Sequence, residues 1–420
     1  MAEGYQDLFR VASLPEALDT LVGQLKPPQP RVETVPTEAA LGRFLAADIV
    51  SRENIPPFAR STVDGYAVRS SDTFGASESS PAYLKLVGRV LMGQPAPVAV
   101  APGEAAAAPT GGMLPEGADA VVMVEYAATI DDAMVEISKP AAPGENVVGA
   151  GEDIREGTVV LGSGRRLRPQ DLGALAALGL SSVEVFQPIR AGILSTGDEI
   201  VDIDAVLREG QVRDINYFTL AAAVRLSGGA PERLGICPDN AGELLRNLRR
   251  GVETCQIVLV SGGSSVGAAD LTPAVINELG PPGVLVHGLS VKPGKPTVVA
   301  LVGQVPVFGL PGHPVSALDI FRLMVDPVIR YLYTGRMEPR LAAPRLRARL
   351  SRNVASVAGR EDRVRVILEE NDGEIWAHPV LGRSGLISLM VRADGVAVIP
   401  YEAEGIGQGG EVTVELIQAG

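Results

Sequence analysis

Residues suited to chemistry gather in four short loops, each of which follows an apolar segment of strand type. The loops are rich in glycine, serine, acid or lysine, and a turn with two lysines (292–296, KPGKP) precedes the last of them. In a parallel α/β sheet, the loops that follow the strands meet in a crevice at the carboxyl edge. We therefore expect one shared site from residues 195–199 (STGDE), 237–240 (CPDN), 261–270 (SGGSSVGAAD) and 309–317 (GLPGHPVSA).

The residue types in these loops indicate binding of a phosphorylated substrate. Glycine and serine at 261–265 let the backbone approach a phosphate closely and turn N–H groups toward it. Pro314 falls near the first turn of a helix, whose amino end can hold an anion. Carboxylates can hold Mg²⁺, and fixed lysines can hold an oxyanion. Together the loops predict cleavage or transfer at a phosphoanhydride, although each one alone also fits an ordinary turn or helix cap.

The elements that position these loops follow a strand, loop, helix pattern from 190 to 334. The pattern predicts a central three-layer α/β/α domain with a mostly parallel sheet. Gly228 and Gly280 stand where helix C-caps belong. The expected strands are AGILST, RLGIC, QIVLVSGG and PVFGLPG, and the expected helices cover 216–229, 240–252, 270–280 and 314–334.

The flanking segments have a different texture. The spacing of apolar residues predicts helices at 13–24 and 36–47 and another from Pro169, with a β-rich insertion at 83–162 between them. After 339, short strands with Asp-Gly turns at Asp372 and Asp394 predict a small β-barrel or sandwich, with Trp376 in its core. We place the domains at 1–50 with 145–186, 51–144, 187–335 and 336–420.

Composition narrows the class of protein. The net charge of −13 over 420 residues argues against nucleic-acid binding. No apolar run approaches the roughly 20 residues of a membrane span, and the first residues lack a signal-peptide pattern, so we expect a cytoplasmic protein. Cys237 and Cys255 are expected to be buried thiols. The three histidines, His287, His313 and His378, lack zinc-ligand spacing.

Seven motifs in a fixed order make the sequence resemble the MoeA family of molybdopterin molybdenumtransferases, which includes the E domain of gephyrin. They are residues 56–68 (PPFARSTVDGYAV), 109–125 (PTGGMLPEGADAVVMVE) and 151–154 (GEDI), followed by STGDE, SGGSSVG, KPGKP and GLPGHPVSAL. The resemblance implies a four-part, elongated subunit, a homodimer, and active sites shared between subunits. It also implies the substrates adenylylated molybdopterin and molybdate, with Mg²⁺-assisted cleavage of the pyrophosphate link during metal insertion.

The resemblance also implies roles for individual residues. Asp270 and Glu199 would hold the metal, and Asp239 would contact the nucleotide half of the substrate. Asp64, Thr110 and Asp153 would be polar site residues brought by the partner subunit. The molybdate pocket would comprise Lys292, Lys295, Pro296, Arg360 and Ser384. The remaining substrate contacts would come from Ser261, Gly262, Gly263, Ser265, Pro311, Gly312 and Pro314.

The sequence departs from the family at three places. His313 stands where the family often has Asn, and Ser264 where it often has Val. Ala268 and Ala269 stand where a second acid commonly precedes the one that matches Asp270. Preference for molybdate over tungstate stays open. So do simpler interpretations, in which Asp64 only starts a turn with Gly65 and Arg360 only makes surface ion pairs.

Other functions also stay open. The adenylyltransferase of the preceding step resembles the central domain alone, and it is also an expected transient partner. A nucleotide pyrophosphatase on the same domain and a gephyrin-like binding scaffold are further alternatives.

Overall fold

The computed structural model describes residues 11–26, 29–131, 133–262, 271–337, 344–380 and 382–417. The chain divides into two compact units. One contains the residues up to Glu33 together with those from Phe186 onward, and the other contains Thr34–Val185. The proposed contacts of Gly263, Ser265 and Asp270 lie outside the described residues. The finer division into four domains stays a prediction.

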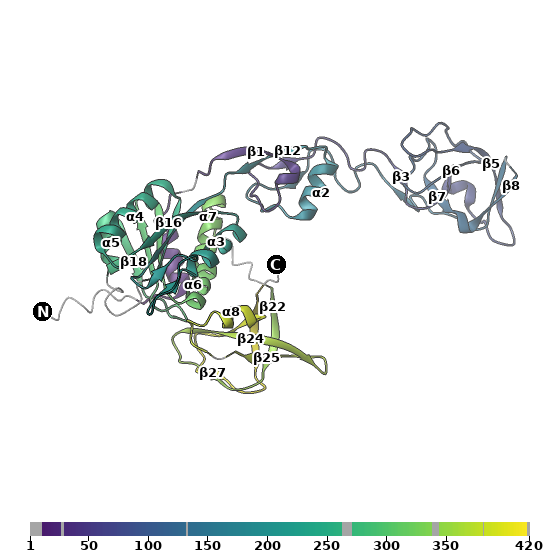
Figure 1. The fold of residues 1–420 in the computed structure, drawn as a ribbon. Coiled ribbons are helices and arrows are strands. Elements are labelled where there is room, and N and C mark those ends of the chain that lie inside the picture. The colour runs from purple at the N-terminus through teal and green to yellow at the C-terminus, as the bar shows by residue number, and fades with distance from the viewer. Residues whose placement is uncertain are drawn as a thin grey trace. The chain divides into compact units, whose positions relative to one another are not determined.

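A six-stranded sheet forms the centre of the first unit, in the order β16-β13-β17-β21-β20-β18 (Figure 1). Strands β16, β13, β17 and β21 are mutually parallel, and β20 runs antiparallel to both of its neighbours. This confirms the predicted mostly parallel sheet. The strands are β13 (Arg190–Thr196), β16 (Ala230–Cys237), β17 (Ile257–Gly262), β18 (Pro282–His287), β20 (Val298–Val302) and β21 (Val305–Leu310).

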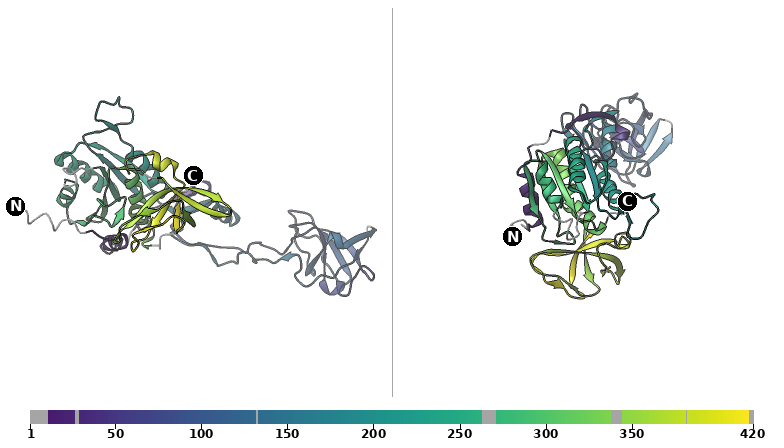
Figure 2. Two further views of the ribbon diagram at one scale, coloured as in Figure 1. Left: turned by 90° about the horizontal axis from the view of Figure 1, so that it is seen from below. Right: turned by 60° about the vertical axis from the view of Figure 1, so that its left-hand side comes forward.

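Helices cover both faces of this sheet, which gives the three layers (Figures 1 and 2). Helices α4 (Ala241–Thr254) and α5 (Leu271–Leu279) pack together on one face. Helices α3 (Asn216–Leu226) and α6 (Pro314–Ile320) pack together on the other. Near the second face, α1 (Leu14–Val22) packs against β18 and β20.

Two of these helices show how the sequence sets their ends and faces. Ser13 and Glu16 form a reciprocal capping box that starts α1. The Asn240 side chain accepts a hydrogen bond from the Glu243 N–H at the start of α4. Leu244 and Leu248, one turn apart on α4, are fully buried. The helices expected at 13–24 and 240–252 therefore form, and each begins at a side-chain N-cap.

The helix predicted at 314–334 is interrupted. A π-helical turn, Phe321–Val325, separates α6 from α7 (Asp326–Thr334). Pro327 lacks the N–H that would continue the regular ladder, which accounts for the irregular turn. At the end of α7, Gly335 adopts a left-handed conformation with φ 66°, a C-cap that glycine accepts without strain.

The segment after the α/β layers forms a closed five-stranded barrel, in the order β24-β25-β22-β28-β26 with β26 paired back to β24. This confirms the predicted C-terminal barrel. Its strands are β22 (Arg345–Leu350), β24 (Glu361–Asn371), β25 (Glu374–Pro379), β26 (Gly395–Ile399) and β28 (Glu411–Leu416), with β23 (Val354–Ala355), β27 (Gly405–Ile406) and α8 (Ser388–Arg392) in the connections.

Two details of the barrel correct the expectations. Asp372 and Gly373 form the predicted two-residue hairpin between β24 and β25, but Asp394 lies between α8 and β26 and makes no hairpin. Trp376 is only partly buried, because strand alternation turns its neighbour Ala377 into the core.

Buried charges join the barrel to the α/β layers. Asp319 of α6 accepts two hydrogen bonds from Arg365 of β24, both at 2.9 Å, and both side chains are buried. Beside them, Arg363 pairs with Glu415 of β28 and with Glu361. Burial acts to lower the pKa of Arg363, but the carboxylates of Asp319, Glu415 and Glu361 outweigh it and raise that pKa. We call Asp319, Arg363, Arg365 and Glu415 the junction cluster.

The second unit is built around a six-stranded sheet in the order β7-β4-β6-β5-β9-β8. Its strands are β4 (Gly65–Val68), β5 (Ala82–Arg89), β6 (Glu104–Ala108), β7 (Ala120–Met123), β8 (Ala127–Asp131) and β9 (Met134–Ile137). Two-stranded pairs join β1 (Val32–Pro36) with β12 (Ser182–Phe186), β2 (Ile49–Val50) with β11 (Val159–Leu161), and β3 (Arg60–Ser61) with β10 (Val147–Val148).

The helix predicted at 36–47 is wrong, whereas α2 (Pro169–Ala177) forms as expected. Residues Thr37–Ala39 make a single 3₁₀ turn. Gly42 then adopts φ 74°, which ends any helical path. Phe44 and Leu45 continue as extended bridges to Arg166 and Val185. Leu45 is buried in one cluster with Leu175 of α2 and Val185 of β12, and this packing, rather than helical spacing, decides the backbone.

Both cysteines are buried and free, as expected. Burial raises the pKa of each thiol. Throughout the described ranges, no helix is long and apolar enough to cross a membrane.

Candidate active site

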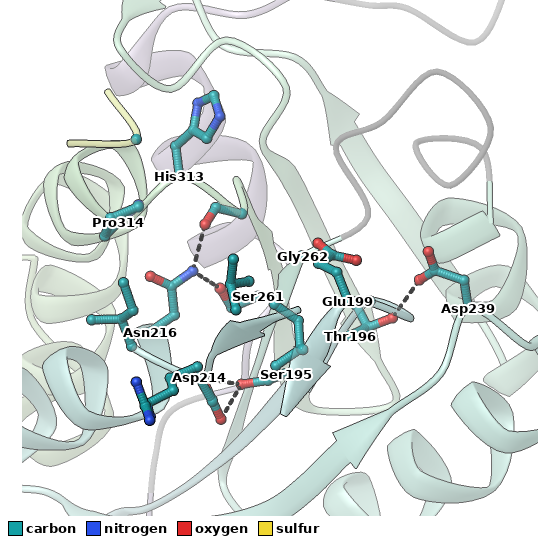
Figure 3. A pocket seen from close by; sticks show the side chains of 17 residues that line it. Ser195, Thr196, Glu199, Asp214, Asn216, Asp239, Ser261, Gly262, His313 and Pro314 are labelled. Carbon is teal, nitrogen blue, oxygen red and sulfur yellow. Dashed lines mark hydrogen bonds between the residues drawn. The ribbon is translucent and has the colours of Figure 1, made fainter. Parts of the chain in front are cut away.

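A pocket of about 340 Å³ lies at the carboxyl edge of the central sheet (Figure 3). The ends of β13 and β17 and the loops after β16 and β21 contribute to its walls. Six of the residues predicted for the site line it, namely Glu199, Asp239, Ser261, Gly262, Gly312 and Pro314. Pro311 is buried in the loop that leads to Pro314. The parallel strands therefore bring together loops that lie far apart in the chain.

Asp239 is oriented by the end of β13. The Thr196 hydroxyl donates a hydrogen bond to the Asp239 carboxylate at 3.0 Å (Figure 3). The Asp239 N–H in turn donates to the Asp198 carboxylate at 3.0 Å. Glu199 folds back over Gly197, where an added Cβ would lie 2.7 Å from Glu199 Oε2. Glycine at 197 thus leaves room for this carboxylate.

These carboxylates fit a Mg²⁺ site in their chemistry. Mg²⁺ is bound through one or two carboxylates together with substrate phosphates and water, and Glu199 and Asp239 supply oxygen donors on one side of the pocket. Within the described ranges, no three His, Cys, Asp or Glu side chains gather as a metal cluster. Asp270, the other predicted ligand, lies outside those ranges.

A buried carboxylate that the sequence analysis did not single out supports the pocket floor. Asp214, 3% exposed, accepts hydrogen bonds from Ser195 Oγ, which lies 2.9 Å from each of its oxygens. It also accepts from the Tyr217 N–H. Arg233 lies 3.8 Å from Asp214 and 3.2 Å from Asp202, and its hydrogen bond to Asp202 lowers the pKa of that carboxyl. These contacts hold the Asp214 side chain in one position.

Asn216, which the sequence analysis also did not identify, connects two walls of the pocket. Its side-chain amide donates to Ser261 Oγ at the end of β17 and to the Gly312 carbonyl after β21, both at 2.7 Å (Figure 3). Asp214 and Asn216 flank the start of α3 in the segment RDIN. Polar residues at a helix start are usually caps, so nothing in the sequence marked Asp214 and Asn216 as site residues.

The barrel contributes one edge of the pocket. His313 Nδ1 lies 2.8 Å from Ser384 Oγ, and the Ser384 carbonyl accepts a hydrogen bond from the Val315 N–H. Gly385 and His313 both line the pocket. Ser384 is therefore held against the GLPGHP loop, 71 residues away in the chain.

The predicted molybdate residues Lys292 and Arg360 meet on a single carboxylate. The turn strand β19 (Val291–Lys292) pairs in parallel with β24, with Lys292 opposite Asp362. Asp362, 3% exposed, accepts hydrogen bonds from Arg360 at 2.7 and 3.2 Å and has Lys292 Nζ at 4.0 Å. Lys295 and Pro296 of the same turn are exposed. The fold thus brings the KPGKP and GRED segments together.

Three predicted residues belong to the second unit. Thr110 donates to Asp64 Oδ1 through its N–H at 2.8 Å and its hydroxyl at 3.1 Å. Asp64 is thus bound to a neighbouring loop rather than starting a simple turn. Gly65 is required beside it, because a Cβ there would lie 2.0 Å from the Val122 carbonyl oxygen. Asp153 is exposed, and its N–H donates to the Ile55 carbonyl.

Family models match the chain in three consecutive parts. Residues 12–179 match the MoeA N-terminal region (domain I and II), 192–331 a probable molybdopterin binding domain, and 347–417 the MoeA C-terminal region (domain IV). The chain belongs to the MoeA family. The family resemblance expected from the seven motifs is confirmed.

Relatives and solved structures of the MoeA family agree over nearly the whole length. The molybdopterin molybdenumtransferase of Haemophilus influenzae is 33% identical over 405 residues, covering 96% of this chain and 98% of that protein. The molybdopterin molybdenumtransferase of Bacillus subtilis is 30% identical, covering 93% and 91%. A crystal structure of the molybdopterin biosynthesis MoeA protein from Pyrococcus horikoshii OT3 superposes with a TM-score of 0.79 at 31% identity, covering 97% of this chain and 100% of that one.

Proposed function

We propose that this MoeA-family chain is a molybdopterin molybdenumtransferase, which inserts molybdate into adenylylated molybdopterin and releases AMP and molybdenum cofactor. The observation that carries the proposal is the pocket at the carboxyl edge of the central sheet. Its walls combine the carboxylates of Glu199 and Asp239 with Ser261 at the end of β17 and Gly312 in the loop after β21. A volume of about 340 Å³ falls within the range of about 300–1,000 Å³ that is usual for small-molecule sites.

In this proposal, the pocket holds the diphosphate and nucleotide half of the substrate. Thr196 keeps the Asp239 carboxylate oriented toward the nucleotide half. Asn216 keeps Ser261 and Gly312 at a fixed separation, so that the backbone of both loops presents the same surface to each incoming substrate. When the reacting groups are held in a fixed geometry, less entropy has to be lost on the way to the transition state.

Glu199 and Asp270 would hold Mg²⁺, which, when bound, neutralises charge on the pyrophosphate link. Glu199 lies in the pocket wall, and its neighbour Gly197 leaves space for the carboxylate.

The basic residues would receive molybdate. Lys292, Lys295 and Arg360 supply fixed positive charge for a tetrahedral oxyanion, and Pro296 and Ser384 complete the surface. Asp362 holds the Arg360 guanidinium by two hydrogen bonds, which limits its orientation. The exposed Lys292 and Lys295 leave room for an anion to approach from solvent.

The proposal includes a cytoplasmic homodimer with shared sites. Asp64, Thr110 and Asp153 would come from the partner subunit, and the Thr110 hydrogen bonds to Asp64 preset that carboxylate. A transient contact with the adenylyltransferase of the preceding step would deliver the substrate.

The decisive assay incubates the purified protein with Mg²⁺, molybdate and adenylylated molybdopterin. We expect release of AMP together with reconstitution of an apo molybdoenzyme. AMP release without reconstitution would contradict the transferase and favour a pyrophosphatase. Repeating the assay with tungstate measures the metal preference, and omitting Mg²⁺ tests the requirement for the ion.

A further inference from the structure

We propose that His313 binds an anionic oxygen of the substrate's linking phosphates through its Nε2–H group. This inference rests on the proposed function, because it assigns part of the adenylylated substrate to one wall of the pocket. His313 would then be a specificity-determining residue of this pocket.

The first step is the position of His313. It lines the pocket together with Gly312, Pro314 and Gly385. In Figure 3, His313 and Pro314 lie on one side of the pocket, whereas Glu199 and Asp239 lie on the other. The linking phosphates carry several oxygens, so some can face the Mg²⁺ that the carboxylates would hold while another faces the His313 wall.

The second step concerns the two ring nitrogens. Nδ1 is hydrogen-bonded to Ser384 Oγ at 2.8 Å, which leaves Nε2 for a ligand. The Cδ2 and Nε2 edge of the ring lies beside Gly385, where an added Cβ would be 3.5 and 3.7 Å from these atoms. When an anion binds at Nε2, the form with the proton on Nε2 is favoured. The Ser384 hydroxyl can rotate and donate to Nδ1 in that form.

The third step is the charge of the pocket. Among the described lining residues, Glu199, Asp214 and Asp239 are acidic, and Arg213 is the cation beside them. The Arg213 guanidinium already donates to the backbone carbonyls of Ile203 and Ala205. Because the Arg213 guanidinium is engaged in this way, the imidazole of His313 would supply the phosphate with a hydrogen-bond donor that Arg213 does not.

Two substitutions separate the two ring nitrogens. His313→Asn places an amide nitrogen near the position of Nδ1, which preserves the contact with Ser384 but removes the reach of Nε2. His313→Gln places its amide nitrogen near the position of Nε2 and gives up the Nδ1 contact. The two variants have the same functional group, so they form a matched pair.

The test measures AMP binding by calorimetry and the KM and kcat of AMP release for the full chain and both variants. We expect His313→Asn to weaken AMP binding and raise KM about tenfold or more, because a hydrogen bond to a charged group is lost. We expect kcat to change less, and His313→Gln to restore binding to within about threefold of the natural chain. Equal thermal melting of the three proteins would confirm that folding is unchanged.

Unchanged AMP affinity in His313→Asn would overturn the inference, and so would equal losses in the two variants. Failure of the proposed function would look different, because the natural chain would then release no AMP from adenylylated molybdopterin.

Discussion

At the scale of single residues, the shape of the pocket depends on polar side chains that form hydrogen bonds with backbone groups and with other side chains. Asn216 spans from Ser261 to the Gly312 carbonyl, and Asp214 receives Ser195 and the Tyr217 N–H. Such residues need not touch the substrate to affect it. They position the loops that do.

We predict that Asn216→Ala lowers the free energy of unfolding by about 1–2 kcal/mol, since two hydrogen bonds are lost. It should also slow AMP release, because the loops at Ser261 and Gly312 lose their common tether. Chemical denaturation and the AMP assay measure the two effects. The matched control is Asn247→Ala, which removes the side-chain bond to the Glu243 carbonyl within α4 and the contact with the Cys237 thiol. A comparable loss of activity in the control would contradict the positioning role of Asn216.

The buried thiols give a prediction about pH. Burial raises the pKa of Cys237 and Cys255 above the ordinary value of 9.0. The folded thiols therefore hold their protons to higher pH than the unfolded ones. Their contribution to stability is complete below pH 9 and is lost as pH rises through the folded-state pKa values.

Alkylation and denaturation at several pH values test this prediction. The native protein should resist iodoacetamide at pH 8, whereas the unfolded protein should react at both cysteines. Replacing both cysteines with alanine should flatten the fall in stability above pH 9. Rapid alkylation of the native protein would show that the thiols are accessible.

At the scale of elements, the junction cluster fixes the barrel on the α/β layers. Arg365 of β24 and Asp319 of α6 are almost fully buried and share two hydrogen bonds. Burial also lowers the pKa of the neighbouring Arg322. Because Ser384 and Gly385 follow the barrel strands β24 and β25 in the chain, the position of the barrel sets one edge of the pocket.

We predict that Asp319→Ala destabilises the protein by about 3–5 kcal/mol, because it leaves the Arg365 charge buried without its partner. Chemical denaturation measures the loss. The control is Arg347→Ala, since Arg347 and Glu411 are an exposed pair with 71% and 62% of their side chains accessible. That change should cost about 0–1 kcal/mol. Similar losses in the two variants would mean that burial of the pair is unimportant.

At the scale of the whole molecule, the proposed site residues are distributed over both compact units. Glu199 and Asp239 belong to the unit with the α/β layers, and Asp64 and Thr110 belong to the unit of Thr34–Val185. A homodimer with shared sites would combine residues from two different chains. This arrangement has a consequence that mixing experiments can measure.

We predict that Asp64→Ala and Glu199→Gln, each inactive alone, regain activity when they are unfolded and refolded together. With random pairing, half of the dimers are mixed and one of the two sites in each is intact, so about a quarter of the natural activity should return. The matched control mixes Asp64→Ala with Thr110→Ala, which lie in the same unit and should not complement. Absence of recovery in the first mixture would argue against shared sites.

The sequence by itself determined the local features of this protein. The Ser13 capping box, the two-residue turn at Asp372 and the apolar stripe of α4 are formed by residues that are neighbours along the chain. The order of strands, glycine loops and helices also placed Glu199, Asp239, Ser261 and Gly312 at the same edge of the sheet. The caps and the turn follow from short-range sterics and hydrogen bonding. The shared edge follows from the rule that the loops after parallel strands meet at the carboxyl edge of a sheet.

Only the tertiary structure decided which distant segments meet. Residues 36–47 form a 3₁₀ turn and extended bridges instead of the predicted helix, and β20 and β18 extend the sheet predicted from four strands, with β20 antiparallel to both neighbours. It also brought Ser384 to His313 and gave Asn216 its two partners. The physical reason is that such contacts depend on how whole faces bury one another, and the spacing of residues along one segment does not encode that packing.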